Sequence, residues 1–241
     1  MGVRLTIAHL YPREMNLYGD AGNIRALVQR LRWRGHDAEV AAVEVGEPFD
    51  LAGADLVFGS GGQDSGQAIV GPDLLARGDE LRAAVAAGVP VLAICGLFQL
   101  FGHGYTPLGG GRIPGIGVFD VDSVGGGERV TGNVVLDTAL GRVVGFENHS
   151  GRTVLAPGQA AFGRVVRGVG NDTASGLEGA RTGAAIGTYL HGPVLPTNPH
   201  LADHLLAAAL RRRGVDEPLA PLDDTLELAV AEAAAARPRR T

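Results

Sequence analysis

The sequence predicts an α/β fold in which a mostly parallel sheet carries helices on both faces and is extended by antiparallel strands. From Arg4 to Ile94, short apolar segments alternate with helix-like segments, and each connection between them is short. Strands that alternate with helices in this way form parallel sheets covered on both faces. Between Gly109 and Gly187 the helical segments disappear, and short β-like runs are separated by glycine-rich turns. This second pattern, of short β-like runs between glycine-rich turns, predicts the antiparallel extension.

Four strands and two helices are expected in the amino-terminal half. Asn23 is a suitable N-cap for a helix over Ile24–Arg34, which has an apolar face and a stop at Gly35. A second helix is expected over Asp73–Ala87, with Gly88 at its end. The expected strands are Arg4–His9, His36–Val43, Asp55–Phe58 and Val91–Ile94.

The remaining elements divide into β-like runs and two carboxyl-terminal helices. The runs are Ile116–Val124, Gly132–Val135, Val143–Glu147, Ala161–Val166 and Ala184–Tyr189. A helix begins at Pro199 and ends near Arg213, and an amphipathic helix over Asp223–Ala236 ends in the basic tip Arg237-Pro238-Arg239-Arg240. We therefore expect one domain over residues 1–214, followed by a linker and a C-terminal helix with its tail over residues 215–241.

Composition excludes several classes of function. The chain has 241 residues, a net charge of −5 and one cysteine. An acidic chain is a poor partner for nucleic acid or an anionic membrane, because phosphate binding needs clustered cations. One cysteine cannot form an internal disulfide or a Cys-based metal cluster, and it is typical of the reducing cytoplasm. No apolar run approaches the roughly 18 residues of a membrane span.

The chain also contains no lysine, so all 21 basic residues are arginine. A Walker-type phosphate loop, a pyridoxal Schiff base and a lysine nucleophile are therefore excluded. The sequence contains no G-x-G-x-x-G motif either. If this protein takes part in ATP-driven chemistry, we expect another chain to bind the ATP.

The single cysteine lies where an expected strand turns into a helix, in the segment Pro90–Leu100. Such a turn lifts its residue out of the sheet and directs the first free N–H groups of the helix at whatever lies above it. A thiolate of Cys95 would be stabilised by the positive end of the helix, with oxyanion donors beside it. A small buried residue at a strand end is the alternative interpretation.

A nucleophilic cysteine needs a base, and two histidines lie at strand ends, as a base would. These are His149 and His191, and their spacing alone does not choose between them. The loop Gly59–Asp64 also follows a strand, and its glycines either let backbone approach a ligand or form a tight turn.

Several segments resemble class I glutamine amidotransferases of the cobyric acid synthase-like branch, and more narrowly the glutaminase subunits of lipid II isoglutaminyl synthases. The likeness runs from about residue 4 to residue 210. The segments are Tyr11-Pro12-Arg13-Glu14-Met15-Asn16-Leu17-Tyr18-Gly19-Asp20 with Gly22-Asn23, Gly61-Gly62-Gln63-Asp64, Ala93-Ile94-Cys95-Gly96, Gly145-Phe146-Glu147-Asn148-His149-Ser150-Gly151-Arg152-Thr153, and Tyr189-Leu190-His191-Gly192-Pro193 with Asn198-Pro199. The resemblance implies the flavodoxin-like fold of this family.

The resemblance also implies a glutaminase with a Cys–His pair. Cys95 would attack the side-chain carboxamide of glutamine. His191 would protonate the departing ammonia and then activate water against the thioester. Backbone N–H groups near Gly61, Gly62 and Gly96 would hold the oxyanion.

Two further substrate-binding residues are implied by position. Arg129 falls where the family has an arginine that holds the α-carboxylate of glutamine, a task that suits a bidentate guanidinium. Gln99 occupies the place of the family's elbow-helix glutamine and would line the pocket or support its packing. An exposed turn arginine is the alternative interpretation of Arg129.

The sequence departs from the family pattern at two places. The branch usually has a glycine two residues after the cysteine, where this chain has Leu97. A side chain there crowds the turn, so Leu97 predicts a distorted elbow or reduced activity. Many relatives have a glutamate two residues after the histidine, where this chain has Pro193. Our hypothesis is that a partner chain supplies the carboxylate that orients His191.

Nothing in the chain resembles an ATP-dependent ligase. The resemblance therefore implies a heterodimer with a Mur-ligase-like subunit (MurT), which would bind ATP and Mg²⁺, while this chain needs no cofactor or metal. The pair would amidate the D-glutamate α-carboxyl of lipid II to D-isoglutamine. The alternatives are an amidotransferase for a corrinoid or another acid, and a catalytically degenerate scaffold subunit.

Overall fold

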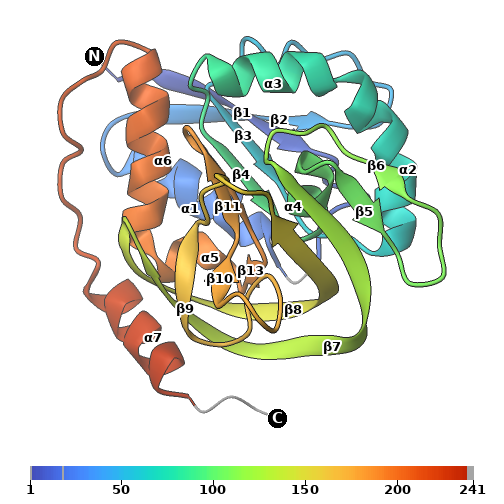
Figure 1. Ribbon diagram of the computed structural model, residues 1–241. Coiled ribbons are helices and arrows are strands. Elements are labelled where there is room, and N and C mark those ends of the chain that lie inside the picture. The colour runs from blue at the N-terminus through green and yellow to red at the C-terminus, as the bar shows by residue number, and fades with distance from the viewer. Residues whose placement is uncertain (1, 18, 238–241) are drawn as a thin grey trace.

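The computed structural model describes residues 2–17 and 19–237, and its centre is a six-stranded sheet (Figure 1). The strand order is β11-β12-β4-β3-β1-β2, and every neighbouring pair is parallel except the edge pair β11–β12. The bounds are β1 Arg4–Leu10, β2 Asp37–Val43, β3 Leu56–Gly59, β4 Val91–Ile94, β11 Ala180–Thr182 and β12 Ala185–Thr188. The predicted α/β class is confirmed, because β3 and β4 are buried at every position, as parallel strands between helices must be.

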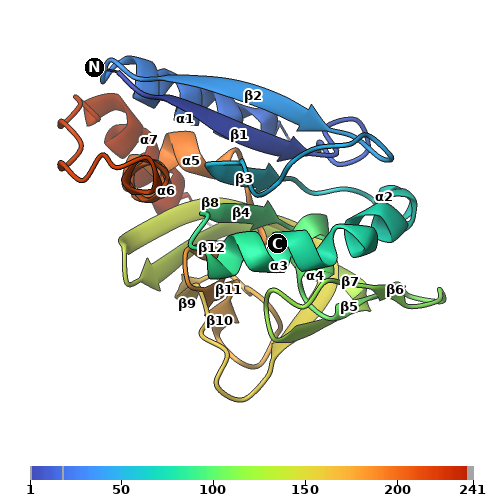
Figure 2. The ribbon, with the colours of Figure 1, turned by 90° about the horizontal axis from the view of Figure 1, so that it is seen from above.

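Helices lie on both faces of this sheet. In Figure 2, α1 passes behind the strands and α3 lies in front of them. Helix α6 contacts α1 and β3, whereas α4 contacts α2 and β4. The bounds are α1 Ala21–Arg32, α2 Asp64–Ala76, α3 Gly78–Ala86, α4 Gly96–Phe101, α5 Val194–Thr197, α6 Pro199–Arg212 and α7 Thr225–Ala236.

A second, mostly antiparallel sheet packs beside the first and is built around the long pair β7–β8. It contains β5 Gly104–Thr106, β6 Ile113–Pro114, β7 Val121–Thr138, β8 Gly141–Leu155, β9 Gly163–Arg167, β10 Leu177–Glu178 and β13 Leu190–His191. The extension was predicted, but the runs Ile116–Val124 and Gly132–Val135 are not separate strands. The end of the first run, from Val121, and the whole of the second lie within β7. The glycines between them form a bulge, where the register shifts between Gly125 and Val130, rather than a turn.

The predicted helix Asp73–Ala87 is wrong in its extent. The structure has two helices here, and α2 begins at Asp64. Glycine and proline inside a helical pattern predict a break, and α2 contains Gly66, Gly71 and Pro72. Burial of one face of α2 against α4 and β6 outweighs these weak local preferences.

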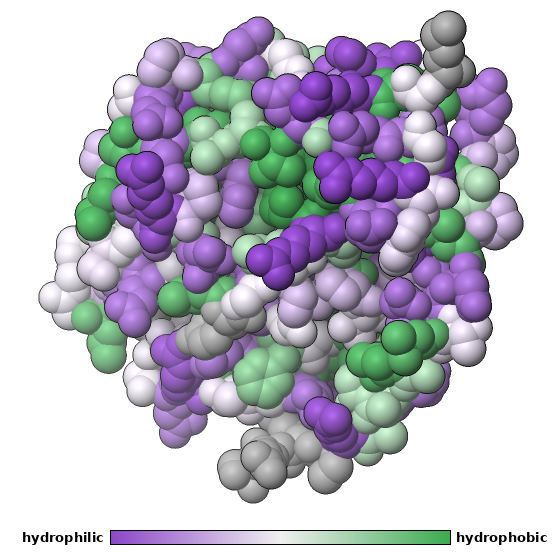
Figure 3. Space-filling model, turned by 180° about the vertical axis from the view of Figure 1, so that it is seen from behind, coloured by the Kyte–Doolittle hydropathy of each residue, from purple (hydrophilic) through white to green (hydrophobic). Residues whose placement is uncertain are grey.

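The C-terminal helix α7 packs back on the second sheet and on α5. Arg30 of α1 holds this segment, because its buried guanidinium pairs with Asp203 of α6 at 2.7 Å and with Asp224, just before α7, at 2.5 Å. Leu226 and Leu228 of α7 are exposed, and apolar side chains gather at the lower right of Figure 3, where α7 lies. The domain boundary at residue 214 stays a prediction.

Two sequence features fall wholly or partly outside the described residues. They are Tyr18 and, apart from Arg237, the basic tip. Within residues 2–17 and 19–237, none of the helices has the length and apolarity needed to cross a bilayer.

Candidate active site

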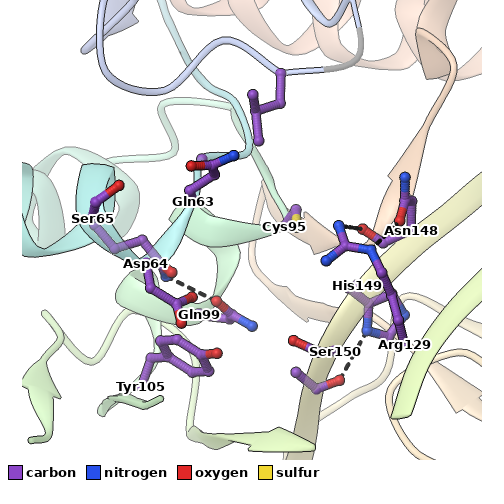
Figure 4. Close-up of a pocket in the computed structure, with 14 residues that line it drawn as sticks. Gln63, Asp64, Ser65, Cys95, Gln99, Tyr105, Arg129, Asn148, His149 and Ser150 are labelled. Atoms are coloured by element: carbon purple, nitrogen blue, oxygen red, sulfur yellow. Dashed lines mark hydrogen bonds between the residues drawn. The ribbon is translucent and has the colours of Figure 1, made fainter. Parts of the chain in front are cut away.

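Cys95 forms a sharp turn between β4 and α4. Its backbone has φ 51° and ψ −106°, a conformation that non-glycine residues rarely adopt. The Cys95 N–H donates to the Thr188 carbonyl at 2.8 Å, and the flanking strand and helix are fully buried. The packed elements on either side hold this strained turn in place, and the side chain reaches the pocket shown in Figure 4. The predicted strand–turn–helix arrangement is confirmed.

Leu97 is accommodated beside the elbow because Gly59 leaves room for it, and its predicted effect on activity stays a prediction. Leu97 is fully buried, and a Cβ atom on Gly59 would lie 2.2 Å from the Leu97 Cδ1 atom. The leucine side chain therefore occupies the space that the side chain of any residue other than glycine would fill at position 59. Position 59, at the end of β3, thus has the glycine that the family pattern has in the elbow.

His191 meets Cys95 at the edge of the glycine loop. A Cβ atom on Gly61 would lie 2.9 Å from the His191 Cε1 atom and 3.1 Å from the Cys95 Cβ atom, so both side chains converge on one point. Cys95 is also one of the groups whose interaction with His191 raises the pKa of this imidazole. The structure therefore brings together the cysteine and the histidine that the resemblance implied.

The carboxylate that orients His191 belongs to this chain. The His191 Nδ1–H group donates to Asp20 Oδ2 at 2.9 Å, and both side chains are fully buried. Our hypothesis that a partner supplies this carboxylate is therefore wrong. Asp20 lies in the first of the matching segments, but 171 residues separate it from His191, and no spacing rule could connect the two.

The surroundings of His191 favour its protonated form. Burial on its own lowers the pKa of the imidazole, but hydrogen bonds and charge interactions with Asp20 and Cys95 outweigh it and raise the pKa to about 10. At neutral pH the imidazole is therefore protonated beside the sulfur. A proton held at this position is available to a departing amine.

One hydrogen bond holds the Asp20 carboxylate, and another holds the start of α1. The Ser60 hydroxyl donates to the same Asp20 oxygen at 2.8 Å. Asn23 does not cap α1 as predicted. Its Oδ1 atom accepts the N–H of Leu195 at 2.8 Å, which ties the start of α1 to the segment after His191. Asn23 thus helps to set the spacing between Asp20 and His191.

The glycines of the site allow backbone to approach the sulfur closely. A Cβ atom on Gly96 would lie 3.1 Å from the Gly62 nitrogen and 2.8 Å from the Met15 methyl carbon. A Cβ atom on Gly62 would lie 2.2 Å from the Met15 sulfur. These distances bring the Gly62 nitrogen close to Gly96 at the elbow, and the role of their N–H groups in holding an oxyanion stays a prediction.

A pocket of about 370 Å³ opens over the sulfur. Arg129 lines it from the bulge in β7, and its Nε–H donates to the Asn148 side chain at 2.6 Å (Figure 4). Bulges redirect side chains from the plane of a sheet, and this one directs Arg129 toward Cys95. Arg129 is thus a pocket residue, as the resemblance implied, and Asn148 is a partner that the sequence did not indicate.

Gln99 lies in a buried network behind the pocket. Its Oε1 atom accepts the Gln67 amide at 2.8 Å, and its Nε2 group donates to the Tyr189 hydroxyl at 3.0 Å. Gly151 makes room for it, because a Cβ atom there would lie 2.1 Å from the Gln99 Nε2 atom. Gln99 therefore lines the pocket and supports its packing at the same time.

His149, the second candidate base, is engaged elsewhere. Its ring stacks on Tyr189 at 3.8 Å, and its Nδ1–H group donates to the Gly151 carbonyl at 2.8 Å. Burial lowers the pKa of His149 to about 3, so this imidazole is neutral at physiological pH. The structure thus separates the two histidines, which the sequence could not.

The fold and the site together define a glutamine amidotransferase. Residues 6–199 match the model of the CobB/CobQ-like glutamine amidotransferase domain, and the chain belongs to this family. Solved structures confirm the fold. The structure titled PurLQS from Thermotoga maritima aligns over 88% of this chain and 99% of its own, with a TM-score of 0.59 and 15% identity. The glutaminase domain of Trypanosoma brucei CTPS aligns over 86% of this chain and 94% of its own, with a TM-score of 0.54 and 12% identity.

Curated relatives show which members of this family the chain is similar to. The chain is 36% identical to the Staphylococcus aureus protein named lipid II isoglutaminyl synthase (glutamine-hydrolyzing) subunit GatD, over 93% of this chain and 92% of that protein. It is 37% identical to the Streptococcus pneumoniae protein of the same name, over 95% and 90%. A cobyric acid synthase from Nocardia farcinica is 37% identical over 64% of this chain but only 31% of its own length.

Proposed function

We propose that this chain is the glutamine-hydrolysing subunit of a lipid II isoglutaminyl synthase. The observation that carries the proposal is the buried Asp20–His191 pair beside Cys95, which lines the same pocket as Arg129. Relatives that match over nearly the whole of both chains carry that name, which supports the same assignment here.

The reaction follows from the site. The Cys95 sulfur attacks the carboxamide carbon of glutamine, and a C–S bond forms as the carbonyl electrons move to oxygen. The N–H groups of Gly62 and Gly96 stabilise this oxyanion. When the C–N bond breaks, His191 donates its proton to the nitrogen, which leaves as ammonia. His191 then takes a proton from water, which attacks the thioester and releases glutamate.

Arg129 binds the α-carboxylate of glutamine in this proposal. A guanidinium presents parallel N–H groups that match a carboxylate. Its hydrogen bond to Asn148 holds the side chain over the pocket before substrate arrives. Gln99 shapes the wall behind the substrate.

The synthetic step requires a second subunit. Ammonia is mostly protonated in neutral water and then cannot act as a nucleophile, so its direct delivery to an activated acid preserves its reactivity. We propose a Mur-ligase-like partner (MurT) that binds ATP and Mg²⁺, forms a heterodimer with this chain and amidates the D-glutamate α-carboxyl of lipid II. This assignment places the subunit in the cytoplasm, where a free catalytic thiol stays reduced.

The test is a coupled assay on the co-expressed complex. We expect glutamate release from glutamine and amidation of lipid II in the presence of ATP, and the loss of both with Cys95→Ser. Free ammonia at high concentration should restore amidation by the Cys95→Ser complex, because only the glutaminase step is lost. A complex that releases no glutamate from glutamine would contradict the proposal.

A corrinoid amide synthase is the second candidate, because cobyric acid synthases match part of the chain. These relatives are about three times as long as the part that matches, whereas the GatD proteins match over 90% or more of their length. Amidation of a corrinoid acid, with none of lipid II, would favour this alternative.

A further inference from the structure

The pocket above Cys95 carries opposite charges on its two sides. Among the described residues that line it, Asp64 is the one carboxylate and Arg129 the one guanidinium. Figure 4 shows them on opposite sides of the cavity, with Cys95 between them. Asp64 has no part in the steps described above, and its place opposite Arg129 needs a separate explanation.

Glutamine itself carries two opposite charges at the end remote from its carboxamide. When the carboxamide reaches the sulfur, the α-carbon lies toward the pocket mouth and presents a carboxylate and an ammonium group. A pocket with an arginine alone would accept any short carboxylate that ends in a carboxamide. An acidic group across from the arginine adds recognition of the ammonium group.

Local structure holds Asp64 at this position. Gln63 is extended, with φ −77° and ψ 164°, and Asp64 is the first residue of α2. The buried Tyr105 lies against it. Burial first, and then the charge of Asp64 and a hydrogen bond to it, raise the pKa of Tyr105 to about 12, so the phenol keeps its proton and can donate it. The Asp64 side chain itself is exposed to the pocket and accessible to a ligand.

We propose that Asp64 binds the α-ammonium group of glutamine and that the pocket thereby selects the free amino acid over carboxamides that lack an α-amino group. This inference rests on the proposed glutaminase activity. Arg129 and Asp64 divide the recognition of the zwitterion between them. Asp64 acts on substrate binding and takes no part in proton transfer at the sulfur.

The experiment compares L-glutamine with glutaramate, which has the same carboxamide and carboxylate but no amino group. Hydrolysis by the complex is followed as ammonia release for the wild type and for Asp64→Asn. Asp79→Asn is the matched control, because it removes the same charge from the first turn of the next helix, at a side chain that is 99% exposed. All three proteins are compared in thermal unfolding.

We expect the wild type and Asp79→Asn to prefer glutamine by about 10- to 100-fold in kcat/KM, the range of one charge-assisted hydrogen bond. Asp64→Asn should lose most of this preference through a higher KM for glutamine. Its kcat for glutamine should change less than about threefold, and its turnover of glutaramate should stay at the wild-type level.

An acidic residue in the first turn also stabilises a helix, and the two substrates separate this role from substrate binding. If Asp64→Asn keeps the wild-type preference for glutamine over glutaramate, or loses kcat/KM equally for both, Asp64 acts on the stability of α2. Either result overturns the inference. A wild-type complex that hydrolyses neither substrate would overturn the proposed function and this inference with it. A wild type that hydrolyses glutamine, with an Asp64→Asn variant that keeps its preference, would overturn this inference alone.

Discussion

Asp20→Asn tests whether the orienting carboxylate belongs to this chain. The substitution keeps the size of the side chain and removes the charge from a fully buried pair in which the two atoms are 2.9 Å apart. A charge-assisted hydrogen bond contributes about 1.5–3 kcal/mol. At 1.36 kcal/mol for each factor of ten, its loss in the transition state lowers kcat roughly 10- to 150-fold.

The substitution should also change the pH dependence. Burial lowers the pKa of His191, and Asp20 and Cys95 together raise it to about 10. Without the Asp20 carboxylate, the effect of burial is less opposed, and the pKa of His191 falls. The imidazole must carry the proton that it gives to ammonia, so the alkaline limb of the kcat/KM profile should move to lower pH.

The assay is glutamate release across pH 6 to about 10.5, for the isolated chain and for the complex, at saturating and at low glutamine. Ser60→Ala is the control, because it removes the second partner of Asp20 but leaves the charge on the carboxylate. We expect a loss of less than about fivefold for Ser60→Ala, with its alkaline limb unchanged. Asp20→Asn with more than half of the wild-type kcat and an unmoved alkaline limb would refute the role of Asp20.

Two further predictions concern folding. Gly59→Ala should destabilise the protein by about 1–3 kcal/mol, because the new Cβ overlaps the buried Leu97 side chain. Leu97→Ala should relieve this overlap, so that the double variant unfolds at a higher denaturant concentration than the sum of the single effects predicts, and strict additivity would contradict the account of the elbow. The stability of Glu178→Gln relative to the wild type should increase as pH rises. Burial raises the pKa of Glu178 to about 7, so the folded state binds a proton that the unfolded state releases above about pH 4.5, and the stability that the carboxyl contributes is lost as pH rises through 7. Denaturant unfolding at pH 5 and pH 8 should therefore give a difference between variant and wild type that grows by on the order of 2–3 kcal/mol, and a pH-independent difference would exclude this titration.

The parallel sheet could be predicted because its determinants are local. The buried strand Val91–Ile94 reads as an apolar run bounded by Pro90 and Cys95, and its observed bounds are the predicted ones. The second sheet was harder to predict, since glycines that read as turns lie inside β7 as a bulge. Helix α2 was missed because its glycines and proline oppose a helix locally, and only its contacts with α4 and β6 stabilise it.

The site could be predicted where a motif marks a residue, and not where two elements meet. Cys95, His191 and Arg129 lie in segments that the family resemblance marks, and the structure brings all three to one site. The choice between His149 and His191 depended on burial and stacking, which no spacing reveals. The tolerance of Leu97 depended on Gly59, which follows a strand as many glycines do. A glycine that makes room for a larger residue on another element can be recognised only once the structure shows that the two residues are in contact.

The position of Asp20 changes the role that a partner subunit can have. The start of α1 is held by the Asn23–Leu195 hydrogen bond, and the Ser60 hydroxyl holds the carboxylate, so within the described residues this chain itself supplies the carboxylate that orients His191. The Cys95–His191–Asp20 arrangement is therefore complete in the isolated subunit. A partner that accelerates glutamine hydrolysis must act on another part of the reaction, such as closure of the pocket mouth near Asp64 and Arg129 or the exit of ammonia. Stimulation by the partner should then persist in Asp20→Asn at the same factor as in the wild type.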